Sequence, residues 1–158
     1  MHVFTILNRK GDKVATTTPA TPVAEVVGAF KANKGGALVV TDRHGKIKGI
    51  LTESEIVAGL AERGPEVLSS PVSAVMAQVT VRCRRGDTAA RAVKQMIKGG
   101  TQHVPVIEDG QLVGVISMSD VIDGQTMVSE ADVTAQSGGG VSEDYAPRVW
   151  AHIKAGHA

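Results

Sequence analysis

The sequence predicts an α/β fold, of the α+β kind, in which one β-α-β-β-α motif occurs twice. The first observation behind this prediction is a repeated stretch, GILTESEI at 49–56 and GVISMSDV at 114–121. Each copy reads glycine, two apolar residues, a hydroxyl residue, two further residues, an acid and an apolar residue. The second observation is that the same order of apolar patterns precedes both stretches. Two small sheets that each bury one face are expected to pack as one pseudo-symmetric module.

The first helix of each motif is predicted from apolar residues that recur on one helical face. These positions are Val23, Val26, Val27 and Phe30 in one copy, and Ala89, Ala92, Val93 and Met96 in the other. We expect Pro22 to take the first helical position with Thr21 as its cap, and Asp87 to cap the second copy. Both helices are predicted to end at glycine pairs, 35–36 and 99–100.

A strand hairpin is predicted after each of these helices. The strands are ALVVT at 37–41 and IKGIL at 47–51 in the first copy, and HVPVI at 103–107 and LVGVI at 112–116 in the second. The pair Asp109–Gly110 is typical of a two-residue hairpin turn. A second helix then begins within each repeated stretch.

These patterns divide the chain into four parts. We predict a first motif at 3–63, a connector at 64–71, a second motif at 72–125 and a tail at 126–158 with a short helix. The connector, GPEVLSSP, carries the glycine, serine and proline residues that are typical of loops.

Composition narrows the class of protein. The chain has 158 residues, of which 42% are hydrophobic, and this content is enough to bury a core. A net charge of +1 and 3% aromatic residues give no reason to expect nucleic acid or an anionic membrane as a partner. Because Cys83 is the only cysteine and no window is as apolar as a membrane span, we expect a cytoplasmic protein.

The sequence contains few residues that indicate a catalytic site. The chain has no P-loop, no HExxH, no nucleophile elbow and no Cys/His spacing for zinc, so we expect neither an enzyme nor a metal site. Arginines on both sides of Cys83 would lower its pKa, but a lone cysteine without a base is usually inert. The basic group of Arg82, Arg84 and Arg85 is either a solvated loop or a contact for the phosphates of a small ligand.

The repeated hydroxyl-x-x-acid element has two interpretations. Thr52 with Glu55, and Ser117 with Asp120, each match a capping box that opens a helix. The same helix start offers free N–H groups to a phosphate, and its carboxylate can accept hydrogen bonds from ribose hydroxyls. A glycine lies three residues before each hydroxyl residue, at Gly49 and Gly114, and it would let a ligand approach the backbone. Capping and binding are compatible, because a carboxylate has two oxygens.

The stretches GALVVTDRHGKIKGILTESEI at 36–56 and QHVPVIEDGQLVGVISMSDV at 102–121 resemble a known family. Their order and spacing resemble a tandem pair of CBS motifs, named after cystathionine β-synthase and called a Bateman module. The resemblance covers about 3–125, and the whole chain is similar to small stand-alone bacterial CBS-pair proteins. It implies two motifs packed around a pseudo-twofold axis, two clefts between them and a homodimer. It also implies adenine ligands: AMP, ADP, ATP, S-adenosylmethionine or NAD(H).

The resemblance further implies which residues bind the ligand. A second site would consist of Val79, Thr80, Val81, Arg82, His103, Val104, Pro105, Ser117 and Asp120, and a first site of Thr16, Ala37, Leu38, Thr52, Ser54 and Glu55. Asp120 would hold the ribose and Ser117 the ribose or phosphate. His103 would face the phosphates, although a histidine at the start of a strand often has only a structural role.

The chain departs from its relatives at two positions where they often carry arginine. Ser54 and Gln102 stand there instead, so two guanidinium groups that would clamp phosphate are absent. This favours the second site over the first, and it favours either a smaller or less charged ligand or an empty first site. We therefore expect a non-catalytic sensor of AMP, with NAD(H) or ATP next, acting on an unknown protein partner. The alternative is a structural interaction module that does not use nucleotide.

Overall fold

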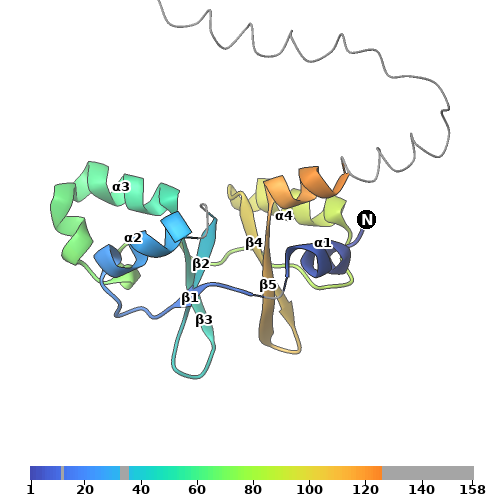
Figure 1. The fold of residues 1–158 in the computed structure, drawn as a ribbon, viewed down its shortest axis with the longest axis horizontal. Helices are drawn as coiled ribbons and strands as arrows, with labels where there is room; N and C mark the ends of the chain where they lie inside the picture. The colour runs from blue at the N-terminus through green and yellow to red at the C-terminus, as the bar shows by residue number, and fades with distance from the viewer. Residues whose placement is uncertain (12, 33–35, 126–158) are drawn as a thin grey trace, which may run out of the picture. The chain divides into compact units, whose positions relative to one another are not determined.

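A computed structural model describes residues 1–11, 13–32 and 36–125 (Figure 1). The predicted tail and its helix lie outside these residues. None of the helices in the described ranges combines the length and the apolarity needed to cross a bilayer.

The first half of the molecule is a three-stranded sheet with two helices. Its elements are β1 (Thr16–Thr17), α2 (Val23–Ala32), β2 (Ala37–Thr41), β3 (Ile47–Thr52) and α3 (Glu53–Arg63). The strand order is β1-β2-β3, with β1 parallel to β2 and β2 antiparallel to β3. The predicted helix and hairpin of this half are therefore confirmed, and the opening strand has only two residues.

The second half repeats this arrangement. It contains α4 (Ala89–Gly99), β4 (His103–Glu108), β5 (Gln111–Ser117) and a helix over 118–125. Its opening strand is reduced to one parallel bridge between Cys83 and Val106. This bridge corresponds to the pair Thr17 and Val40 in the first half, because both of its residues lie 66 positions later in the chain. The hairpins share a register shift after the corresponding residues Val40 and Val106.

The local signals for turns and caps were confirmed in part. Asp109 and Gly110 have φ of 50° and 77°, as the predicted two-residue turn requires. The prediction that Asp87 caps the helix was wrong, because Thr88 accepts the hydrogen bond from the Arg91 N–H at 3.2 Å. The carboxylate of Asp87 instead accepts from the backbone N–H of Arg84 at 2.9 Å.

Pro22 was also misplaced by one residue. Helix α2 begins at Val23, so Pro22 precedes its first turn. Pro22 instead forms an isolated antiparallel bridge with Pro71, which places the start of α2 beside the connector 64–71.

An additional helix, α1 (Val3–Lys10), was not predicted. It lies at the start of the predicted first motif, 3–63, but it packs with the second half, beside β5 and α4 (Figure 1). Val3, Ile6 and Leu7 are buried in the core of that half.

In the same way, the first half is completed by a segment that follows it in the sequence. This segment contains two 3-10 helices, η1 (Gly64–Ser69) and η2 (Val72–Ala74). Val72 is fully buried in the core of the first half, and Ala77 pairs with Ile50 of β3. Each half is thus completed by the segment that precedes the other half's motif.

Candidate functional site

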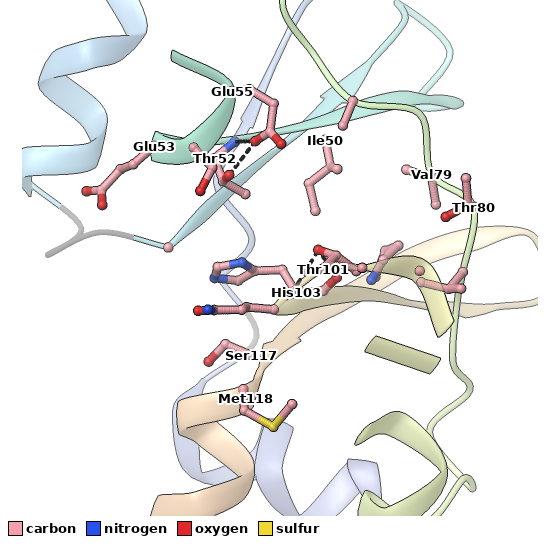
Figure 2. Close-up of a pocket in the computed structure, with 18 of the residues that line it drawn as sticks. Ile50, Thr52, Glu53, Glu55, Val79, Thr80, Thr101, His103, Ser117 and Met118 are labelled. Carbon is pink, nitrogen blue, oxygen red and sulfur yellow. Dashed lines mark hydrogen bonds between the residues drawn. The ribbon is translucent and has the colours of Figure 1, made fainter. Parts of the chain in front are cut away.

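A pocket of about 690 Å³ is lined by residues from both halves. Its walls come from the end of β3 and the start of α3, from 77–81, from the end of α4 and the start of β4, and from the start of the 118–125 helix. Figure 2 shows Thr52 and Glu55 on one side, Ser117 and Met118 on the opposite side, and His103 between them.

The side that belongs to the first half is a capped helix start. Thr52 ends β3 and precedes α3, and the Glu55 carboxylate accepts a hydrogen bond from the Thr52 N–H at 2.8 Å. The Thr52 hydroxyl also donates to this carboxylate. Both bonds end on Oε2, so the long arm of Glu55 folds back onto its own helix.

The side that belongs to the second half is also a capped helix start, and its acid has a further contact with a lysine. The Asp120 carboxylate accepts from the Ser117 N–H at 2.7 Å, and the Asp120 N–H donates to Ser117 Oγ at 3.2 Å. Lys10, the last residue of α1, also donates to the carboxylate at 2.7 Å. Burial raises the pKa of Asp120, but the hydrogen bonds from Lys10 and Ser117 outweigh it and hold the pKa below its usual value.

His103 stands where the two sides meet. The Thr101 hydroxyl anchors its backbone, donating to the His103 carbonyl at 3.1 Å and accepting from its N–H at 3.2 Å. Burial lowers the pKa of His103, and the positive charge of Lys10 lowers it further, against the opposing effect of the nearby carboxylates. The neutral imidazole is therefore favoured in the pocket.

The structure brings together residues that were predicted for two separate sites. Those that line the pocket are Val79, Thr80, Val81, His103, Pro105, Ser117 and Asp120 of the predicted second site, and Thr52, Ser54 and Glu55 of the predicted first site. The others are not part of its lining: Arg82 and Thr16 are exposed, Val104 and Leu38 are buried in the cores, and Ala37 is half-buried. Side chains alternate along a strand, so the neighbours of lining residues point elsewhere.

The reason given for the repeated glycines was wrong. Neither Gly49 nor Gly114 lines the pocket. A Cβ at Gly114 would lie 2.5 Å from Leu7 Cδ2, and one at Gly49 would lie 2.8 Å from the Ala77 carbonyl oxygen. Both glycines therefore make room for the segment exchanged from the other half, and not for a ligand.

Lys10 is one of several lining residues that the sequence did not identify, as are Glu53, Gln78 and Thr101. It lies outside both repeated stretches, and its helix has no counterpart in the predicted motif. The only local signal was its place in a helical last turn, where basic residues are common.

Cys83 has no part in the pocket. Burial raises the pKa of its thiol to about 11, and the charge of Asp87 acts in the same direction against that of Arg91. The effect that flanking arginines can have on a thiol does not prevail here, because the thiol is buried in the core of the second half, as suits an inert cysteine.

The CBS domain model matches residues 7–62 and 72–125. The CBS-domain protein ATU1752 from Agrobacterium tumefaciens is 38% identical, with a TM-score of 0.75 over 79% of this chain and 99% of that one. The CBS domain pair of protein MJ0100, solved with 5′-methylthioadenosine and S-adenosyl-L-methionine, is 21% identical, with a TM-score of 0.69 over 79% of this chain and 99% of that one.

Curated relatives carry the same region within longer chains. The Arabidopsis thaliana CBS domain-containing proteins CBSCBSPB5 and CBSCBSPB4 are each 27% identical over 107 residues, which is 68% of this chain. The chain spans only 20% of the length of each of these two proteins. The family match covers most of the described residues, in two copies that coincide with the two halves of the fold. This chain belongs to the CBS domain family and carries a tandem pair of CBS domains.

Proposed function

We propose that the pocket binds an adenosine-containing ligand, AMP first of all, and that the protein is a non-catalytic sensor of that ligand. One observation carries the proposal: two helix starts, each with an acid at its third residue, border the same pocket from the two halves. A helix start provides N–H groups for a phosphate, and its acid provides an acceptor for ribose hydroxyls.

Asp120 is the better placed of the two acids to hold a ribose. The Lys10 and Ser117 bonds to its carboxylate both end on Oδ2, which leaves Oδ1 as a further acceptor. The lowered pKa keeps the carboxylate charged at neutral pH. We place the adenine against 79–81 and Pro105, where backbone groups and apolar side chains line the pocket.

The size of the pocket and one related structure support this ligand class. Pockets for ligands of this size generally measure about 300–1,000 Å³, and this one measures about 690 Å³. The domain pair of MJ0100, which shares the fold, was solved with two adenosine-containing molecules. AMP, ATP, NAD(H) and S-adenosylmethionine are therefore the compounds to test.

A bound ligand would touch both halves and so favour one arrangement of them over another. A sensor works by such a difference in affinity between two states. A protein partner that recognises one arrangement would then read the ligand concentration.

The first test is calorimetric titration of the full chain with AMP, ATP, NADH and S-adenosylmethionine. Asp120→Ala is expected to weaken AMP binding by about 1.5–3 kcal/mol, the usual range for a hydrogen bond to a charged group. Asp123→Ala is the matched control, because Asp123 is an exposed acid on the same helix that does not line the pocket.

Binding that is weakened in Asp120→Ala and kept in Asp123→Ala would support the ribose assignment. Equal affinity in both variants would remove Asp120 from the site. If the wild-type protein binds none of the four compounds, the adenosine-sensor proposal is wrong.

Exposed apolar residues favour a second candidate function, an interaction module. On α3, Val57 is 64% exposed and Leu60 is 38% exposed, and Ile122 on the last described helix is 55% exposed. Exposed apolar residues on these two helices support contact with a second copy of the chain or with a protein partner. The oligomeric state can be measured by sedimentation of the titrated samples.

A further inference from the structure

The pocket has an unusual charge balance for a nucleotide site. Among the described residues that line it, Lys10 is the only lysine or arginine, whereas Glu53, Glu55 and Asp120 are acidic. His103 adds no full positive charge near neutral pH, because burial and Lys10 disfavour its protonation. The lining therefore carries one permanent cation against three carboxylates.

The single cation is already held at the proposed ribose site. Its ammonium lies 2.7 Å from Asp120 Oδ2 and 3.3 Å from the Val115 carbonyl oxygen. The Lys10 side chain is 42% exposed and that of Asp120 is 20% exposed. An ion pair with this exposure is weak, so its partners can separate at little cost.

We propose that Lys10 selects the phosphate of a nucleoside monophosphate, by moving from Asp120 to the phosphate while Asp120 takes the ribose hydroxyls. This inference rests on the proposed function, because it assumes that an adenosine compound enters the pocket. Lysine suits such an exchange, since its ammonium is a compact charge on a flexible four-carbon chain. Helix α1, which the second half holds firmly in its core, brings this charge to the pocket.

The same charge balance selects against longer phosphate chains. One phosphate can be matched by Lys10 and by the N–H groups of the two helix starts. A second and third phosphate bring negative charge beside Glu53 and Glu55, and no further lysine or arginine among the described lining residues offsets it. The expected order of affinity is AMP, then ADP, then ATP.

The test compares adenosine, AMP and ATP by calorimetry on the full-length wild type and on Lys10→Met. Wild type is expected to bind AMP roughly ten- to a hundred-fold more tightly than adenosine, the effect of one hydrogen bond between charged groups. In Lys10→Met the preference for AMP over adenosine is expected to fall to about two-fold or less. Adenosine is expected to bind as tightly as before or more tightly, because the ion pair between Lys10 and Asp120 no longer has to break. The control is Lys13→Met, the same change at an exposed lysine that does not line the pocket.

A second variant tests the acidic part of the inference. Glu53→Gln is expected to raise the affinity for ATP relative to AMP by about three-fold or more, because it removes one repulsive charge. Glu62→Gln is the matched control on the same helix, since Glu62 is exposed and does not line the pocket.

The outcomes separate this inference from the function on which it rests. An unchanged ratio of adenosine to AMP affinity in Lys10→Met would overturn the role of Lys10 and leave the adenosine site standing. Tighter binding of ATP than of AMP by wild type would overturn the selection against longer chains. If the wild type binds neither adenosine nor AMP, the proposed function itself is wrong, and this inference is overturned with it.

Discussion

The two acids at the helix starts, Glu55 and Asp120, occupy corresponding positions but differ in chemistry. The longer side chain of Glu55 accepts hydrogen bonds from the backbone N–H and the hydroxyl of Thr52. Asp120 has a shorter arm, caps its helix through one oxygen and shares that oxygen with Lys10. Among the described residues, Lys10 contacts only the acid of the second copy, so the two helix starts differ in charge.

The pocket residue His103 allows a prediction about pH. Its pKa in the folded protein is below the ordinary value of 6.5, so the unfolded chain takes up the proton first as pH falls. The contribution of His103 to stability is therefore fully present above about pH 6.5 and is lost as pH falls toward the folded pKa. We expect the free energy of unfolding to decrease less between about pH 7.5 and 5 in His103→Gln than in wild type.

Urea unfolding at a series of pH values measures this difference. His44→Gln is the control, because His44 lies exposed in the β2–β3 turn and does not line the pocket. Parallel pH profiles for wild type and His103→Gln would show that protonation of His103 does not contribute to the pH dependence of stability.

At the scale of the elements, helices α2 and α3 each contain a glycine but in different surroundings. Gly28 of α2 is exposed, and a Cβ there would have no neighbour within 4 Å. Gly59 of α3 is buried, and its Cβ would lie 2.8 Å from Val67 Cγ2 and 3.1 Å from Val75 Cγ1. Gly59 is therefore what lets η1 pack closely on α3.

The same substitution is expected to have opposite effects at these two positions. Gly28→Ala should raise the free energy of unfolding by about 0.5–1 kcal/mol, because alanine loses less backbone entropy in a helix. Gly59→Ala should lower it by about 1–3 kcal/mol, because the added methyl group overpacks the contact with Val67. Urea unfolding of both variants checks the prediction, and a loss of stability in Gly28→Ala would contradict it.

At the scale of the whole molecule, the described residues form two separate cores with exchanged segments. The core of the second half includes α1, which comes first in the sequence, and the core of the first half includes Val72, which follows that half. Each half thus depends on residues that its own repeat does not contain. The pocket between the halves is lined by residues of both halves and by Lys10 at the end of α1.

This exchange predicts where a core mutation acts. Leu7 is 1% exposed and belongs to the core of the second half. Leu7→Ala should cost about 2–5 kcal/mol, the usual range for a leucine truncated in a core. Hydrogen exchange should accelerate in α4, β4 and β5, far along the chain from the mutation, and much less in the neighbouring α2, β2 and β3.

The matched variant for this experiment is Leu51→Ala. Leu51 is fully buried in the core of the first half, so its truncation should accelerate exchange in α2, β2 and β3. If both variants accelerate exchange equally throughout the chain, the two cores open as one unit and the assignment of α1 to the second half has no local consequence.

The sequence by itself determined the helix, the hairpin and the following helix start of each half, because the signals for these are local, but it did not predict α1 or the 3-10 helices. Apolar periodicity predicted α2 and α4, Asp109–Gly110 predicted its hairpin turn, and the hydroxyl-x-x-acid spacing predicted both capped helix starts. The family resemblance, which the family match confirms, rested on the same repeated spacing.

The tertiary structure alone decided which distant segments meet. No periodicity within a repeat shows that Leu7 fills the space above Gly114, that Ala77 pairs with Ile50, or that Lys10 reaches Asp120. These contacts join residues far apart in the chain, and they depend on burial and shape, which a local pattern does not encode. For that reason the sequence identified the two acids of the candidate site, but only the fold placed them around one pocket and brought Lys10 beside Asp120.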